Sequence, residues 1–421
     1  MRFKGQKGFC FLLTITLLSS CGGGGGSSGS NSNTPSVSLS SSSISSQSSS
    51  SASSIADLTE CELLNFKSDE TISYKLPILY GHCSTAETIV DIEVAGKTYT
   101  WPVINGYFKG PVLLYKGINE IRLSARSKTV YAKLRYEPSS NPQKVQMVYA
   151  IAANDDGHYL AAAGEPNDME SAKKRLILES LMMQSATAEM MYKATGEHQT
   201  FALVEDENGE PIINTFQMPQ TREMLYALAG ETIYYSIRDL LKTEEQSVNK
   251  YMVTMGFSSY EKGVNLAHTA LGGNNLAVFG SLHLHTCPST LDEITASFSN
   301  VTRIDTTILP DDSAGRGTYW ANCATGMGAS LHELGHTFGL PHTDYGIMSR
   351  GFDHFNRLFM ITEPNYSRSP ITQENEYDAI WHPAFADHLL EHQAFRARRA
   401  QQVLSASGKG QLVRRDLAQA G

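Results

Sequence analysis

One segment of eleven residues, 332–342, restricts the fold and chemistry of this chain more than any other feature. It reads HELGHTFGLPH in one-letter code. Histidines four positions apart lie on one face of a helix, so His332 and His336 can bind one metal ion together. Glu333 lies beside them, where its carboxylate can take a proton from water. The segment therefore predicts a helix that carries a metal site.

The second half of the segment predicts how a third ligand reaches the metal. Gly339 is expected to end the helix, and Pro341 prevents the helix from resuming. The chain can then turn back and bring His342 to the ion. Three protein ligands leave a position open for water, as in catalytic zinc sites, whereas structural zinc sites are closed by four. We therefore expect one catalytic Zn²⁺ ion bound by His332, His336 and His342.

The pattern H-E-x-x-H-x-x-G-x-x-H resembles the signature of the metzincin metallopeptidases. This resemblance implies an α/β peptidase domain in which Glu333 is catalytic and a methionine turn forms a hydrophobic floor beneath the metal. Met348, in the segment YGIMS, is the candidate methionine. Some metzincins carry a tyrosine two residues later, but this chain has Arg350 there. Tyr345 or Tyr366 could supply an equivalent hydroxyl group.

The wider sequence, over about residues 145–395, is similar to a poorly characterised metzincin-type family of zinc metallopeptidases from fungi and bacteria. This resemblance does not define the substrates. Our hypothesis is a surface-anchored, zinc-dependent endopeptidase that hydrolyses peptide bonds of proteins or glycoproteins with water activated by Glu333, and whose substrate is an extended peptide or protein. The segment 271–280 has the composition of a hairpin and an apolar strand. It is interpreted either as a sheet edge that pairs with such a peptide or as an interior strand.

Two other metal-binding schemes compete with the three-histidine site. Gluzincins use a glutamate downstream of H-E-x-x-H, and Glu376 lies forty residues after His336. His283 and His285 alternate on an expected strand, where they could border the cleft or hold another metal. A partly exposed strand pair without a metal is the simpler interpretation of these two residues.

The N-terminus has the pattern of an export signal. Arg2, Lys4 and Lys7 precede an apolar run over residues 9–18, which is too short to span a bilayer because about 20 residues are needed. The following Leu-Ser-Ser-Cys resembles the lipobox of bacterial lipoproteins, so residues 1–20 are expected to be removed and Cys21 to be lipidated. An ordinary secretory signal is the alternative. By the same resemblance, a residue other than Asp after Cys21 favours anchoring in the outer membrane of the cell envelope.

Four cysteines remain for the exported protein: Cys61, Cys83, Cys287 and Cys323. An even number of cysteines in an exported protein indicates disulfides, and four cysteines allow three pairings. We favour Cys61–Cys83 and Cys287–Cys323, because each pair then stays within one expected domain. A pro-segment thiolate from Cys61 or Cys83 that caps the metal is the alternative.

The residues after the signal divide into four regions. Residues 21–58 are rich in Gly and Ser and are expected to form a flexible tether. Residues 59–140 are expected to form an antiparallel β-sandwich, because short strands alternate with turns, and one stretch resembles bacterial immunoglobulin-like modules. Residues 143–400 are expected to form the α/β catalytic domain, and residues 401–421 a tail. The elements expected are strands at 71–78, 88–94, 99–103, 112–115, 120–125, 130–136, 146–153, 200–204 and 251–257, and helices at 168–194, 220–242 and 385–404.

Composition excludes several classes of protein. Hydrophobic residues make up 41% of the 421 residues, which is typical of globular chains and unlike disordered or multi-span membrane proteins. The formal charge of −9 argues against a nucleic-acid partner, which requires clustered Lys and Arg. We expect a monomer that contacts the membrane only through its lipid. The competing hypothesis is a surface-tethered binding lipoprotein whose zinc domain is catalytically weak or inactive.

Overall fold

The computed structural model describes residues 61–126, 128–242, 248–376 and 378–396, all within one compact unit. The signal peptide, Cys21, the Gly/Ser-rich tether and the tail lie outside the described residues, so the interpretations of these segments stay predictions. Among the helices that the structure describes, none is long and apolar enough to cross a bilayer.

Two β-sheets account for most of residues 62–136. The smaller sheet has the order β1-β3-β6, with β1 at Glu62–Leu63, β3 at Ile78–His82 and β6 at Tyr107–Pro111. The larger sheet has the order β2-β8-β7-β4-β5, with strands at Glu70–Ile72, Lys128–Tyr136, Gly117–Ala125, Ile89–Val94 and Lys97–Pro102. Side chains of β7 alternate between buried and exposed, as expected for a sheet with one face toward the core.

The N-terminal strands depart from the prediction at three places. The strand expected at 71–78 is not continuous, because β2 ends at Ile72 and β3 begins only at Ile78. Strands β2 and β8 pair in parallel, so the expectation of wholly antiparallel pairing is wrong there, and the immunoglobulin-like character of the region stays a prediction. The strand expected at 112–115 is absent, because β6 already ends at Pro111. Val112 and Leu114 still donate backbone hydrogen bonds to Pro77 and Lys75, but these bonds form no regular ladder.

A second five-stranded sheet forms the centre of the α/β region. Its order is β10-β9-β11-β15-β14, with strands at Ile213–Gln217, Val145–Ile151, Lys250–Met255, Leu276–Gly280 and Leu271–Gly273. The first four strands are parallel, and β14 pairs with β15 in the antiparallel direction at one edge. The hairpin predicted at 271–280 is therefore confirmed, and β14 is the edge strand of the sheet.

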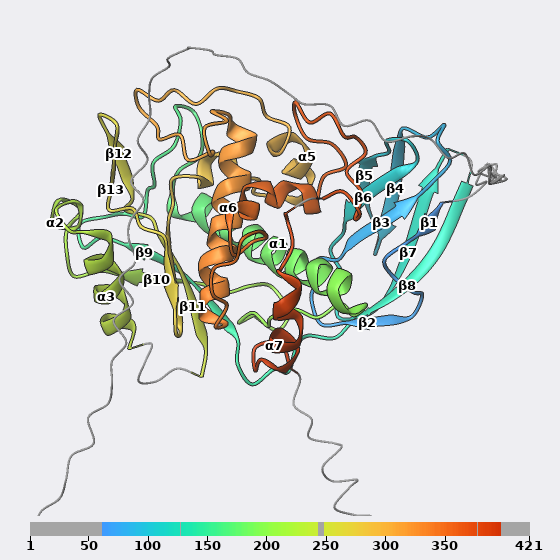
Figure 1. Ribbon diagram of the computed structural model, residues 1–421, viewed down its shortest axis with the longest axis horizontal. Helices are drawn as coiled ribbons and strands as arrows, with labels where there is room; N and C mark the ends of the chain where they lie inside the picture. Colours follow the sequence, from blue (N-terminus) through green and yellow to red (C-terminus); the bar gives the residue numbers. More distant parts are fainter. Residues whose placement is uncertain (1–60, 127, 243–247, 377, 397–421) are drawn as a thin grey trace, which may run out of the picture. The chain divides into compact units, whose positions relative to one another are not determined.

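Helices cover both faces of this sheet, as Figure 1 shows. Met147 and Tyr149 of β9 belong to the same hydrophobic cluster as the helices α1 (Met169–Thr195) and α6 (Tyr319–Thr337). Val148 of β9 instead packs in a separate cluster with the helices α2 (Arg222–Tyr226) and α3 (Gly230–Leu241). All seven residues of β9 are buried for this reason, since a strand covered on both faces has no polar side.

The remaining predictions for the α/β region are confirmed in part. The long helix expected at 168–194 is α1, and the Asp168 side chain caps its N-terminus. The helix expected at 220–242 is divided into α2 and α3, because the chain turns at Leu228 and Ala229 before α3 begins at Gly230, a poor helix former. The strand expected at 200–204 is reduced to isolated bridges such as that between Val145 and Leu203.

Short elements complete the described chain. They are β12 (Ser259–Glu261), β13 (Val264–Leu266), η1 (Leu284–Thr286), η2 (Leu291–Glu293), α5 (Ile294–Ser297), η3 (Arg350–Leu358), η4 (Pro383–Phe385) and α7 (Ala386–Glu391). The helix expected at 385–404 is thus described only as far as η4 and α7. The β12–β13 hairpin precedes β14, and η3 follows the segment that contains Met348.

Candidate metal centre

Helix α6 carries the first two histidines of the motif and ends where the sequence predicts. It runs from Tyr319 to Thr337, and Gly339 takes a left-handed backbone conformation with φ +81° directly afterwards. The N–H groups of Phe338 and Leu340 both donate to the carbonyl oxygen of Gly335, which tightens the last turn. The chain then reverses, as Pro341 requires.

The reversal brings the three predicted histidines together. The Nε2 atom of His342 lies 3.2 Å from Nε2 of His332 and 3.1 Å from Nε2 of His336. Three imidazoles bound to one tetrahedral zinc ion at the usual bond length have nitrogens about 3.3 Å apart. Among the described residues, this is the group of three whose ligand atoms are close enough to hold a metal ion. The geometry of the chain's own residues therefore fits zinc.

Backbone carbonyl groups orient two of these imidazoles. Nδ1 of His332 lies 2.7 Å from the carbonyl oxygen of Ile347, and Nδ1 of His336 lies 2.8 Å from that of Leu340. A hydrogen bond donated by Nδ1 leaves the lone pair of Nε2 free for a metal. Burial lowers the pKa of His332 to about 4 and also lowers the pKa of His336. Both imidazoles are therefore neutral near pH 7, as metal binding requires.

Glu333 is held in a dehydrated position beside the histidines. Its side chain is buried on α6, and burial raises its pKa to about 8. Its carboxylate lines the same cavity as His332 and His342. A carboxylate whose proton affinity is increased by burial is suited to take a proton from a water molecule in this cavity.

Met348 lies beneath the helix, as the resemblance to metzincins implies. It is fully buried, and it lines the cavity together with His332. The chain approaches α6 closely here, because a Cβ atom at Gly335 would lie only 2.5 Å from the sulfur of Met348. The glycine at the third position after His332 thus makes room for the methionine.

A cavity of about 400 Å³ opens beside the histidines. Four residues of α6 line one side of it, namely Thr325, Ala329, His332 and Glu333. The rest of the lining comes from other parts of the chain and includes His268, Ala270, Phe279, Asp312, Thr343, Ser349, Arg350 and Phe352. Sequence analysis did not identify His268 or Asp312, because neither lies near the motif or in a pattern of its own.

Arg350 occupies the cavity wall in place of the missing tyrosine. Its guanidinium group donates two hydrogen bonds of 3.0 Å to the carboxylate of Asp353 and lies 4.6 Å from the centre of the Phe352 ring. The two alternative tyrosines are engaged elsewhere. Tyr345 packs against His382, and Tyr366 lies beneath the guanidinium group of Arg357.

Glu376, the gluzincin-type alternative, is not near the histidines. Its carboxylate is buried and paired with Lys109 at 2.7 Å and with Lys193 at 3.2 Å. The carboxylate of Glu376 is thus neutralised by two ammonium groups, and the structure contradicts a role of Glu376 as a metal ligand. His342 provides the third nitrogen instead.

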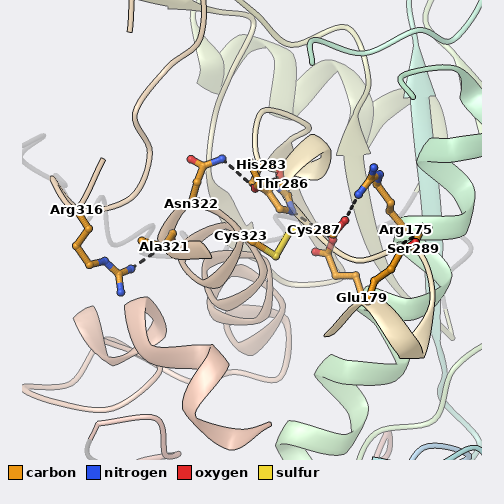
Figure 2. Close-up of a disulfide and its surroundings, with 11 residues drawn as sticks. Arg175, Glu179, His283, Thr286, Cys287, Ser289, Arg316, Ala321, Asn322 and Cys323 are labelled. Atoms are coloured by element: carbon orange, nitrogen blue, oxygen red, sulfur yellow. Dashed lines mark hydrogen bonds and ion pairs between the residues drawn. A yellow bond between two sulfur atoms is a disulfide. The ribbon is translucent and has the colours of Figure 1, made fainter. Parts of the chain in front are cut away.

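The expectation of a partly exposed strand pair with His283 and His285 is wrong. Both side chains are buried, and the segment turns into η1 directly after β15. Nε2 of His283 lies 3.2 Å from a carboxylate oxygen of Glu179 on α1, and His285 contacts the edge of the Tyr319 ring. Figure 2 shows His283 near the disulfide and Glu179 beside α1, so that their contact connects the start of η1 to α1.

Both favoured disulfides are present. Cys61 is bonded to Cys83, and Cys287 is bonded to Cys323. The first bond leaves neither thiol free to cap the metal, so the pro-segment alternative is contradicted. The second bond joins the residue after η1 to the second turn of α6, as the sulfur atoms in Figure 2 show.

Comparisons with known proteins agree with the zinc-site geometry. A family model named Metallopep, with the description "Putative peptidase family", matches residues 60–418. A "Putative zinc metalloproteinase" of Saccharomyces cerevisiae is 25% identical over 384 residues, covering 80% of this chain and 55% of the yeast protein. A protein of the same description from Schizosaccharomyces pombe is 25% identical over 374 residues, covering 80% and 61%. This chain thus spans only about half to three fifths of these relatives.

Solved structures show weaker similarity. Catalytically inactive OgpA from Akkermansia muciniphila, in complex with an O-glycopeptide, has 14% identity and a TM-score of 0.37, with 62% of this chain and 64% of that chain covered. Archaemetzincin from Methanopyrus kandleri has 12% identity and a TM-score of 0.26, with 59% and 94% covered. The match of the family model to most of the sequence shows that the chain belongs to the Metallopep family of peptidases.

Proposed function

We propose that this chain is a zinc-dependent endopeptidase of the metzincin type that hydrolyses peptide bonds in proteins or glycoproteins. The observation that carries the proposal is that three imidazole nitrogens meet beside a buried glutamate. The Nε2 atom of His342 lies 3.1–3.2 Å from the Nε2 atoms of the other two histidines. The names of the two fungal relatives support zinc as the metal. One ion at this site accounts for all three histidines.

The residues of the cavity divide the chemistry among them. A bound zinc ion supplies Lewis acidity, which polarises the scissile carbonyl group and makes water easier to deprotonate. Glu333 accepts the proton of the attacking water and transfers it to the leaving amine. Arg350 lines the same cavity, and its guanidinium group, which is paired with Asp353, would add positive potential that favours negative charge on the carbonyl oxygen.

The edge strand β14 gives a path for an extended substrate. Its outer edge faces no other strand in the described sheet, and Gly272 packs directly against the backbone of Glu333. A peptide that pairs with β14 would therefore lie along the cavity with its backbone beside the histidines. This arrangement supports the first of the two interpretations of residues 271–280.

The proposed enzyme acts at the bacterial cell envelope as a monomer. Lipidation of Cys21 would anchor it in the outer membrane, and residues 21–58 would let it reach substrates at a distance from the surface. This part of the proposal rests on the sequence pattern of residues 1–58 alone.

Cleavage-site profiling tests the proposed activity. The zinc-loaded protein is incubated with a peptide library derived from a cell lysate, with and without a chelator, and new peptide ends are identified by mass spectrometry. We expect internal cleavages that the chelator abolishes and added zinc restores. If no peptide is cleaved under any condition, the alternative hypothesis of a surface-tethered binding protein is favoured instead.

A further inference from the structure

The cavity contains a charged side chain that the proposed hydrolysis does not use. The carboxylate of Asp312 is about one third exposed, and it accepts no hydrogen bond from the residues that the structure describes. Its nearest ionisable neighbour is His268, whose Nε2 lies 3.9 Å from Oδ2 of Asp312. This distance is too long for a hydrogen bond. Asp312 therefore presents to the cavity a carboxylate that receives no hydrogen bond from the described side chains.

Asp312 lies close to the part of α6 that precedes the histidines. Its backbone N–H donates a hydrogen bond of 3.3 Å to the side chain of Asn322. Asn322 precedes His332 by ten residues of α6, or about 15 Å along a helix axis. Thr325 and Ala329 line the cavity between these two levels. The cavity thus extends along α6 from the histidines toward Asp312.

The other charges in this part of the cavity are compensated. The guanidinium group of Arg350 is bound through two hydrogen bonds to Asp353. Burial lowers the pKa of His268, so this imidazole is neutral near pH 7 and does not balance a carboxylate. Burial also raises the pKa of Asp312, although the neighbouring His268 acts in the opposite direction.

Apolar groups line the route to this carboxylate. The ring of Phe279, from β15, and the methyl group of Ala329, from α6, both border the cavity. Such walls suit the methylene stem of a long side chain whose charged end reaches further. A carboxylate at the end of an apolar passage selects a cationic side chain, because the two opposite charges form a charge-assisted hydrogen bond.

We propose that Asp312 selects substrates with a lysine or arginine residue next to the scissile bond. The inference rests on the proposed peptidase function and adds the substrate class. The ammonium or guanidinium group would donate charge-assisted hydrogen bonds to Asp312, while the stem of the side chain packs against Phe279 and Ala329. His268 would border the bound cation as a neutral neighbour.

The test begins with the unmodified protein. Cleavage-site profiling should show lysine and arginine enriched at one position beside the cleaved bond. Two peptides built on the preferred site are then compared, one with arginine and one with citrulline, which has the same shape without the charge. We expect kcat/KM to be about 10- to 100-fold higher for the arginine peptide, the range given by a hydrogen bond to a charged group.

Variants then test whether the preference for arginine over citrulline depends on Asp312. In Asp312→Asn the preference for arginine over citrulline should fall to about 3-fold or less. The matched control is Asp239→Asn, which makes the same change on an exposed carboxylate of α3. It should leave both peptides unaffected. Zinc content and thermal melting establish that each variant is folded.

A binding measurement separates this inference from the proposed function. Calorimetry with the Glu333→Gln variant compares the affinities for the arginine and citrulline peptides without turnover. If Glu333→Gln binds the arginine peptide more tightly than the citrulline peptide, and the double variant Glu333→Gln/Asp312→Asn binds both equally, the role of Asp312 is supported. This result does not depend on how active the enzyme is. Cleavage without enrichment of basic residues, or equal affinities for the two peptides, would overturn the role of Asp312 and leave the peptidase function standing. Complete absence of chelator-sensitive cleavage would overturn the proposed function instead.

Discussion

Gly272 is the residue at which the edge strand touches the helix of the metal site. A Cβ atom at this position would overlap the backbone carbonyl group of Glu333. The end of a flexible side chain can rotate away from such a clash. Backbone atoms inside a regular helix cannot, because the whole helix would have to shift. The close approach of β14 to α6 therefore depends on a residue without a side chain.

We predict that Gly272→Ala destabilises the protein by about 1–3 kcal/mol, the usual cost of overpacking a close contact. It should also lower peptide cleavage, because β14 is displaced from the cavity. The neighbouring Gly273→Ala is the matched control, since the nearest atom to its added Cβ, the hydroxyl oxygen of Tyr234, is 3.8 Å away. Denaturant unfolding of both variants measures the difference. Equal stability of the two would contradict this account of the contact.

Some residues of the site can be predicted from the sequence and others cannot. The positions of His332, His336 and His342 follow from local spacing, because the helix period and the turn at Gly339 determine where three nearby side chains point. Asp312 reaches the same cavity from a separate loop. Its place depends on how that loop packs against α6, and no local pattern encodes such a contact.

Helix α6 is fixed at both ends by different means. Near its start, the Cys287–Cys323 disulfide joins it to the chain that leaves β15. At its end, the two histidines bond to the carbonyl oxygens of Ile347 and Leu340. The histidine end can therefore keep its geometry without the disulfide, since its own hydrogen bonds and any bound metal hold it.

We predict that the Cys287→Ser/Cys323→Ser double variant is less stable by roughly 3–4 kcal/mol, because the bond closes a long loop in the unfolded chain. The sequence separation of 36 residues determines this magnitude. Zinc content should stay near that of the wild type. Guanidinium unfolding and metal analysis of the purified variant check both statements. Loss of zinc from a protein that remains folded would show that the disulfide also positions the histidines.

Helices and strands could be predicted from the sequence where the apolar residues of their buried faces follow a regular spacing. Strands β9 and β11 are mostly apolar, and α1 has apolar residues at helical spacing. Sequence reasoning failed where tertiary contacts override the local pattern. The division between α2 and α3 and the turn of the chain into η1 at His283 both depend on packing against neighbouring elements, which the local sequence does not specify.

At the scale of the whole molecule, α1 connects the N-terminal sheets to the α/β region. His198, which follows α1, lies with its ring between those of Phe66 and Tyr192, at centroid distances of 4.1 and 4.3 Å. Its two nitrogens face the carboxylates of Glu70, at 2.8 Å, and Glu189, at 3.5 Å. Burial alone would lower the pKa of His198, but these two carboxylates outweigh burial and raise it to about 9.

This buried imidazolium predicts a dependence of stability on pH. A group whose pKa is higher in the folded state stabilises the fold fully below its unfolded pKa of 6.5, and this contribution is lost as pH rises toward about 9. The loss should be on the order of 3 kcal/mol. Denaturant unfolding at pH 6, 7.5 and 9, compared with His198→Gln, measures it. A parallel pH profile in the variant would contradict the assignment to His198.

The predicted division of the chain at about residue 140 stays a prediction. The N-terminal sheets share a continuous hydrophobic cluster with α1 and α6, and Lys109 of β6 forms a buried ion pair with Glu376. Composition and turn signals indicated a change in the type of structure at this point. They contained no information on how much surface the two parts bury against each other.

The central claim is that Glu333 performs the proton transfer at a zinc ion that the three histidines hold. The most direct measurement combines zinc content with peptide cleavage in Glu333→Gln, using Glu391→Gln on the exposed side of α7 as the control. We predict about one zinc ion per chain in both variants and in the wild type, with cleavage reduced at least 100-fold only in Glu333→Gln. Undiminished cleavage by zinc-loaded Glu333→Gln would contradict the account.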